Sequence, residues 1–229
     1  MSSVSLMRLY NTNKRVISFK NNPVPFLNGL TSNDMQAPHN ALLNIHGKII
    51  ATFAQAKIND DEFWICVEEL YVPAVHEHLQ KYVALARVQM SVLDQHVYYD
   101  LDGEYPLEKD EVAIPQRKGR LIITPRHLTA DVTEEQFTVF RLKNNIPQMG
   151  IDYKDDFILN VCADDFVSFT KGCFLGQEPV SKVYNRSKPT WKLIVKYEGE
   201  CTDEERAKMT SKATDKETAR TMGFVFVKN

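Results

Sequence analysis

Short runs of hydrophobic residues separated by polar turns dominate the chain. Their length and their flanking Asn, Gly and Pro residues predict β-strands. The predicted strands are 7–10, 16–19, 41–45, 49–53, 62–67, 87–93, 96–101, 121–124, 191–197 and 222–227. The turn at 11–14 joins the first two strands, and Gly47 supplies the turn of a hairpin between 41–45 and 49–53.

Helical spacing of hydrophobic residues interrupts this pattern at a few places. The period lengthens over 68–86, which predicts a helix, and 24–30 reads as a shorter one. Thr133 followed three residues later by Gln136 fits a capping box, so a helix begins there and continues to 144. A helix over 177–184 is expected to begin near Pro179, whereas 200–216 is polar and weakly helical.

Antiparallel-looking strand pairs with single helices between them favour an α+β fold over a regular βαβ alternation. Residues 1–190 then form the main body, which could contain two interleaved subdomains. Residues 191–229 contain only two convincing strands, too few for an independent barrel. We therefore expect a truncated C-terminal β segment that packs on the body.

Composition and charge exclude some classes of protein. Hydrophobic residues make up 43% of the chain and charged residues 25%, which is ordinary for a soluble globular protein. The net charge of −2 gives no overall attraction for polyanions, so a dedicated nucleic-acid-binding role is not expected. No stretch resembles a signal peptide or a membrane span, and the four cysteines form no CxxC pair. These features predict a cytoplasmic protein with reduced thiols.

Residues 171–178, Lys-Gly-Cys-Phe-Leu-Gly-Gln-Glu, are the most informative stretch. Gly172 and Gly176 allow a tight loop that exposes backbone N–H groups. Within this loop Lys171 precedes the thiol of Cys173 by two residues, a setting that favours the thiolate. The alternative from the local sequence is a loop whose cysteine is simply a small buried hydrophobic residue.

Other common site patterns are missing. No histidine pair has the spacing of a zinc site, so no metal is expected. The glycine patterns of dinucleotide and P-loop sites and the GxSxG elbow are also missing. The acidic pair Asp164 and Asp165 lies six residues before the glycine–cysteine loop, and helix capping is its expected role.

Cations and aromatic residues alternate after the loop. Such a pattern suits an anionic ligand with a flat ring system, and the alternative is a solvated helix face and strand edge. The residues are Lys182, Tyr184, Arg186, Lys188, Trp191 and Lys192.

The 171–178 stretch resembles the KGC[FY]xGQE signature of the YgfZ family, folate-binding relatives of the glycine-cleavage T-protein that are linked to iron–sulfur cluster maintenance. Further likeness lies in 27–34, 141–152 and 167–170, in the family's order, and it extends from about residue 5 to 195. The resemblance implies a T-protein-like folate-binding fold with antiparallel sheets, flanking helices and an abbreviated C-terminal barrel.

Two positions depart from the T-protein pattern. T-proteins carry an aspartate pair just after the glycine of the second hairpin, where this chain has Ala51 and Thr52. They also carry a glutamate after the Arg-Leu of the later helix, where this chain has Lys143. Aminomethyl transfer by the T-protein route is therefore not expected.

The resemblance implies a tetrahydrofolate, or a one-carbon derivative of it, in a central cavity. Asn33 and Asp34 are then assigned to the pterin end, and Arg186 or Lys188 to the glutamate tail. The remaining assignments fall in the loop, where Cys173 and Lys171 are the catalytic candidates. Gly172, Gly176, Gln177 and Glu178 are assigned to binding of the cofactor, with Gln177 and Glu178 orienting the loop or the ligand.

The function that this implies is a folate-binding protein that assists the assembly or repair of iron–sulfur proteins, with such proteins as partners and neither nucleic acid nor membrane. Two alternatives stay open. One is a folate-dependent aminomethyltransferase. The other is a non-catalytic adaptor that uses the same loop only to grip a partner.

Overall fold

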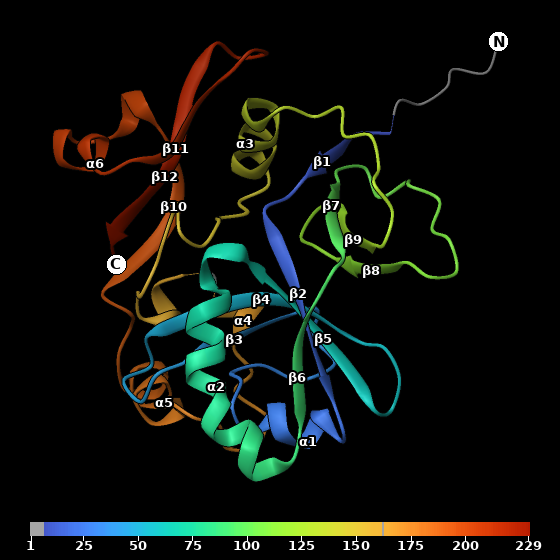
Figure 1. The fold of residues 1–229 in the computed structure, drawn as a ribbon. Coiled ribbons are helices and arrows are strands. Elements are labelled where there is room, and N and C mark those ends of the chain that lie inside the picture. Colours follow the sequence, from blue (N-terminus) through green and yellow to red (C-terminus); the bar gives the residue numbers. More distant parts are fainter. Residues whose placement is uncertain (1–6, 162) are drawn as a thin grey trace.

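The computed structural model describes residues 7–161 and 163–229, so Cys162 lies outside the described residues. Three antiparallel sheets carry the fold, and helices lie against and between them (Figure 1). The described helices are α1 (Pro23–Asn28), α2 (Val72–Ala86), α3 (Glu134–Lys143), α4 (Ala163–Phe166), α5 (Gln177–Arg186) and α6 (Asp203–Ala207). Short 3-10 turns are η1 (Glu69–Tyr71), η2 (Ile158–Asn160) and η3 (Glu198–Glu200). The mixed architecture with antiparallel sheets is as expected.

The central sheet has five strands in the order β3-β4-β5-β2-β6. Their bounds are β3 (His39–Leu43), β4 (Ile49–Lys57), β5 (Glu62–Glu68), β2 (Lys14–Lys20) and β6 (Gln89–Leu93). The hairpin between β3 and β4 turns at Gly47, as predicted, and Gly47 has a φ of 72°. The predicted helix over 68–86 is divided between η1 and α2.

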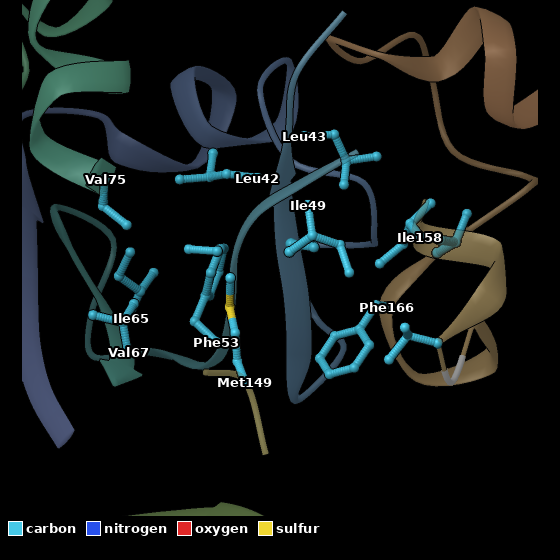
Figure 2. Close-up of a cluster of buried hydrophobic side chains, with 14 of the residues drawn as sticks. Leu42, Leu43, Ile49, Phe53, Ile65, Val67, Val75, Met149, Ile158 and Phe166 are labelled. Atoms are coloured by element: carbon cyan, nitrogen blue, oxygen red, sulfur yellow. The ribbon is translucent and has the colours of Figure 1, made fainter. Parts of the chain in front are cut away.

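Both faces of this sheet are buried. Along β2, Val16 belongs to one hydrophobic core while its neighbour Ile17 belongs to another. Along β5, Cys66 and Ile65 divide in the same way. Successive side chains of a strand point to opposite faces, so the sheet separates two cores. Figure 2 shows the first core, where residues of β3, β4 and β5 meet α2 and the 149–166 region.

The second core lies between the central sheet, α3 and a four-stranded sheet in the order β1-β7-β9-β8. These strands are β1 (Leu9–Asn11), β7 (His96–Asp100), β9 (Arg120–Thr124) and β8 (Val112–Pro115). The 11–14 turn joins β1 to β2, as predicted, but the two strands do not pair with each other. β1 pairs with β7 and β2 pairs with β5 and β6, so the chain crosses from one sheet to the other at this turn. The sequence pattern also missed β8, a short strand that ends at Pro115 and lies close to Gly119.

The C-terminal segment forms a third sheet of order β10-β12-β11, from β10 (Trp191–Tyr197), β11 (Thr210–Asp215) and β12 (Arg220–Lys228). β11 corrects the prediction of weak helix over 200–216, of which only α6 is helical. The polar side chains of β11 hid it, because it is an edge strand. In the described part of the chain this sheet stays open and forms no closed barrel.

Candidate functional site

A cavity of about 290 Å³ lies between the central sheet, the four-stranded sheet and α3. Its volume is at the lower end of the range for small-molecule sites. Segments far apart in sequence line it: the β1–β2 turn, β4, the β8–β9 turn, α3, the 146–153 loop and α4. Ile151, which is 45% exposed, is one of its lining residues, so the cavity reaches the surface there.

Aromatic rings form one wall. Tyr10 stacks on Phe137 of α3 with ring centroids 4.0 Å apart, and Tyr99 lies 5.1 Å from Phe137. The hydroxyl of Tyr10 donates to Glu134. Burial and this carboxylate raise the pKa of Tyr10, and burial raises that of Tyr99. Both phenols therefore stay protonated at neutral pH and offer flat, neutral faces.

Two ion pairs border the same cavity, one partly buried and one fully buried. Lys14 and Glu68 lie opposite each other in the register of β2 and β5, and their side chains form an ion pair. Burial lowers the pKa of Lys14, but Glu68 more than offsets this, so the pKa stands above its ordinary value. Arg141 of α3 pairs with Asp152 at 2.8 Å, and their side chains are 3% and 0% exposed.

The C-terminal sheet holds the second of these pairs in place. Ser211 accepts a hydrogen bond from Arg141 and donates one to Asp152, at 2.8 and 2.6 Å. Thr210 donates to the same carboxylate at 2.8 Å. Within the described residues, Nε of Arg141 is buried without a hydrogen-bond partner. A buried donor of this kind is rare, and the cavity wall therefore retains unused hydrogen-bonding capacity.

The two positions that depart from the T-protein pattern can now be placed. Thr52 of β4 lines the cavity, and its hydroxyl lies 2.6 Å from that of Tyr153. Lys143 is not among the residues that line the cavity, and it pairs with Asp215 of β11 and with Glu217 in the turn that follows. No carboxylate therefore occupies either position.

Two further polar pairs line the cavity beside α4. Asp165 forms an ion pair with Arg117 at 2.7 Å. His39 lies 2.9 Å from the side-chain oxygen of Gln116, and burial lowers the pKa of this imidazole, which is therefore neutral at pH 7. The acidic pair noted in the sequence lies in the first turn of α4, and one member of it reaches the site.

The ammonium group of Lys171 is fixed by backbone oxygens. Its Nζ donates to the carbonyls of Asn28, Thr31 and Asn33 at 2.9, 2.7 and 2.9 Å. Burial lowers the pKa of Lys171 to about 8. All three N–H bonds of the ammonium group are used on the 28–33 segment, so none of them is left for the thiol.

Cys173 is exposed, and neither it nor Lys171 lines the cavity. Gly176 has a φ of 86° and lies against the β3–β4 hairpin, where an added Cβ would stand 2.4 Å from the carbonyl oxygen of Asn44. At Gly172 an added Cβ would meet nothing within 4 Å. Gln177 and Glu178 begin α5, outside the cavity lining.

Asn33 is buried just behind the cavity wall. Its amide donates to the carbonyls of His39 and Asp165 at 3.0 and 2.8 Å, so it joins two segments that line the cavity. Asp34 instead accepts a hydrogen bond from the N–H of Gln36 at 2.8 Å and lines a different groove.

Arg186 and Lys188 are exposed at and just after the end of α5, and neither is among the cavity lining. The structure therefore places the loop and the α5 cations on one segment, apart from the residues that line the cavity. The assigned roles of all these residues stay predictions.

Sequence reasoning assigned no role to the main residues of the cavity. Tyr10, Lys14 and Glu68 come together only through strand pairing across two sheets. One signal was present in the sequence, because Arg141 stands between the hydrophobic Phe140 and Leu142 of a predicted helix. A charge inside such a run is often a buried, paired group.

Within the described ranges, no three His, Cys, Asp or Glu side chains are grouped as a metal site would need. None of the described helices combines the length and the hydrophobicity that crossing a bilayer requires.

No family model matches the sequence. A curated protein of Haemophilus influenzae, described as uncharacterized, is 25% identical over 154 residues, which is 61% of this chain and 52% of that protein. The chain thus spans about half the length of this relative.

Among solved structures, the glycine cleavage system aminomethyltransferase T from Bartonella henselae superposes with a TM-score of 0.76. The alignment covers 96% of this chain and 78% of that structure at 14% identity. The chain therefore has the fold of this T-protein, with one cavity at the meeting of its two larger sheets.

Proposed function

We propose that this chain binds a tetrahydrofolate, or a one-carbon derivative of it, through the pterin ring in the cavity between the two larger sheets. The observation that carries the proposal is the cavity itself, a small aromatic-walled space with buried charges at its edges in a T-protein fold. A pterin has apolar faces and hydrogen-bonding edges, which is the combination that such a wall accommodates.

Different residues of the cavity would contact the faces and the edges of the pterin ring. The stacked pair Tyr10 and Phe137 offers a flat surface for a ring, and Glu68 and Arg141 offer charged groups of both signs at the cavity border. The cavity holds only a small ring system, so the glutamate tail of a folate would lie outside it, toward the exposed rim at Ile151.

The residues of the cavity favour folate binding without the aminomethyl transfer that T-proteins catalyse. Thr52 stands where the resemblance places an aspartate, and a threonine hydroxyl does not act as a carboxylate base at neutral pH. Mixing the purified protein with an aminomethyl donor and tetrahydrofolate tests the transferase alternative, and turnover would support it over binding alone.

A melting experiment tests folate binding. We expect 5-formyltetrahydrofolate to raise the unfolding temperature in a concentration-dependent way, corresponding to about 2.7 kcal/mol at a hundredfold excess over Kd. The tail fragment p-aminobenzoylglutamate, which lacks the pterin, is expected to have no such effect. Equal stabilisation by both compounds would contradict binding through the pterin ring, and stabilisation by neither would favour the adaptor alternative.

Two variants at one position sharpen this test. Tyr10→Phe keeps the ring that stacks on Phe137 and is expected to retain folate stabilisation. Tyr10→Ala removes the ring and is expected to lose most of it. Circular dichroism of both variants establishes that each is folded.

We also propose, from the resemblance of the 171–178 stretch, that the protein assists iron–sulfur proteins and that Cys173 is its reactive group. The exposure of this thiol supports the proposal. Cys173→Ala is expected to abolish rescue of an iron–sulfur enzyme's activity in a strain that lacks the protein. Undiminished rescue would remove the thiol from the function and leave folate binding unaffected.

A further inference from the structure

Arg141 of α3 is buried at the wall of the cavity with hydrogen-bonding groups left over. Its Nη1 donates to Asp152 at 2.8 Å and to the carbonyl of Ile146 at 3.2 Å, and its Nη2 donates to Ser211 at 2.8 Å. Its Nε is buried and has no partner within the described ranges. A buried donor without an acceptor destabilises a fold, so an arginine kept in this state points to an acceptor that a ligand supplies.

The partners of Arg141 show which part of the guanidinium is left for a ligand. Asp152 and Ser211 are not among the residues that line the cavity, whereas Arg141 and Phe137 are. The guanidinium carbon lies 5.9 Å from the ring centroid of Phe137, which precedes it by about one turn of α3. Two of the three hydrogen bonds therefore anchor the Nη end outside the cavity lining, and the unpartnered Nε is left beside the aromatic wall.

An irregular stretch of β11 fixes this orientation. The pairing register of β11 and β12 shifts between Thr210 and Ala213, and Ser211 has a left-handed φ of 48°. Successive side chains of a regular strand point to opposite faces, yet the hydroxyls of Thr210 and Ser211 both donate to the same oxygen of Asp152, at 2.8 and 2.6 Å. A strained backbone of this kind is typical of functional sites, so β11 is shaped to hold the buried pair.

The carboxylates of the cavity already have partners. The acidic residues among the cavity lining are Glu68, Glu134 and Asp165. They accept hydrogen bonds from the side chains of Lys14, Tyr10 and Arg117, respectively. The wall thus combines engaged acidic acceptors with a buried donor that is unused. A ring that enters the cavity is therefore selected by an acceptor on its edge.

We propose that Nε of Arg141 donates a hydrogen bond to the ring carbonyl of a bound pterin, so that the cavity selects 4-oxo pterins over 4-amino pteridines. The carbonyl at carbon 4 is an acceptor, whereas an amino group at the same carbon is a donor. A donor placed against Nε leaves both groups unpaired, which a buried site penalises strongly. The inference rests on the proposed function, because it names the ligand atom that the same cavity recognises. Ser211 is then a positioning residue that acts through Arg141.

Folic acid and aminopterin test this selection, because they share one skeleton and differ in the carbonyl or amino group at carbon 4. Isothermal titration of the wild type is expected to give a Kd for folic acid that is lower than that for aminopterin by at least about tenfold. Equal affinities, or tighter binding of aminopterin, would overturn the inference and leave folate binding in place. So would binding of 5-formyltetrahydrofolate without binding of folic acid, because both carry the carbonyl. Failure of all three compounds to bind would contradict the proposed function and this inference with it.

The variant Arg141→Lys separates a direct contact from a structural role. Lysine keeps a positive charge beside Asp152 but lacks Nε and the planar fork of the guanidinium. We expect folic acid to bind this variant about tenfold more weakly and aminopterin to bind it about as well as it binds the wild type. An equal loss for both compounds is the result of a merely structural arginine and would overturn the inference. Circular dichroism establishes that the variant is folded, and the wild-type comparison decides the question if it is not.

The variant Ser211→Ala tests the positioning role. It removes one of the three anchors of the guanidinium and is expected to reduce the preference for folic acid about threefold. The matched control is Thr214→Ala, which removes another hydroxyl of β11, one that lies 2.9 Å from the hydroxyl of Thr221 in an exposed pair. This control is expected to leave the preference unchanged. The same change in both variants, or in neither, would contradict a positioning role for Ser211.

Discussion

At the scale of single residues, the structure gives different surroundings to the two catalytic candidates of the 171–178 stretch, Lys171 and Cys173. The ammonium group of Lys171 donates hydrogen bonds to three carbonyls of the 28–33 segment. Asn33, behind the cavity wall, belongs to the same segment. The lysine of the motif is thereby linked to the cavity through the backbone, whereas the exposed Cys173 faces outward.

The two glycines of the same stretch give a direct test of this arrangement. Gly176→Ala is expected to destabilise the fold by more than about 1 kcal/mol, the cost of the left-handed backbone alone, because its Cβ would also meet the carbonyl of Asn44 at 2.4 Å. Gly172→Ala is expected to cost less than about 0.5 kcal/mol. Urea denaturation of both variants measures the difference, and equal costs would show that the loop does not dock as described.

The buried thiol of Cys66 predicts how the stability of the fold changes at alkaline pH. Burial raises the pKa of Cys66 from its ordinary 9.0 to about 12. Between these values the unfolded chain loses a proton that the folded chain keeps, so rising pH lowers the stability. We expect the wild type to lose about 1.4 kcal/mol more than Cys66→Ala between pH 8 and pH 10. Parallel pH profiles of the two proteins in urea unfolding would contradict this.

At the scale of elements, α3 connects the proposed site with the C-terminal sheet. Its capping box forms as predicted, with Thr133 accepting from the N–H of Gln136 and the Gln136 side chain accepting in return. One face of the helix carries Phe137 and Arg141 to the cavity. The end of the helix contacts β11 through Lys143 and Asp215. The C-terminal segment therefore supports the cavity wall as well as covering the body.

The buried pair of Arg141 and Asp152 should be the most sensitive link in this arrangement. Asp152→Asn leaves the arginine buried without its counter-charge and is expected to cost about 3–5 kcal/mol. Asp155→Asn, three residues away, breaks an exposed pair with Lys48 at 3.7 Å and is expected to cost less than about 1 kcal/mol. Calorimetric melts of both variants provide the comparison, and a small cost at residue 152 would remove the link.

At the scale of the whole molecule, local patterns predicted most elements but not their assembly. The α2 and α3 helices, the β3–β4 hairpin and most strands follow from spacing and caps. The crossing of the chain between sheets at residues 11–14 does not, because a turn of the same composition could join paired strands. β8 and β11 were missed because proline and polar side chains masked edge strands.

The cavity could not be predicted either, because it depends on how the elements assemble. Its walls come from many segments spread between residues 10 and 166, and pairing within the two larger sheets decides which of their side chains meet. The motif at 171–178 was easy to find because all its residues are adjacent in sequence. The sequence alone therefore indicated the loop, whereas the tertiary structure was needed to locate the cavity.

Hydrogen–deuterium exchange with and without 5-formyltetrahydrofolate tests the central claim most directly, because it reports both binding and place. We predict slower exchange in the segments that line the cavity, 10–14, 52–54 and 134–153, and unchanged exchange over 168–188. Protection confined to 168–188, or no protection at saturating ligand, would contradict a folate site in the cavity between the two larger sheets.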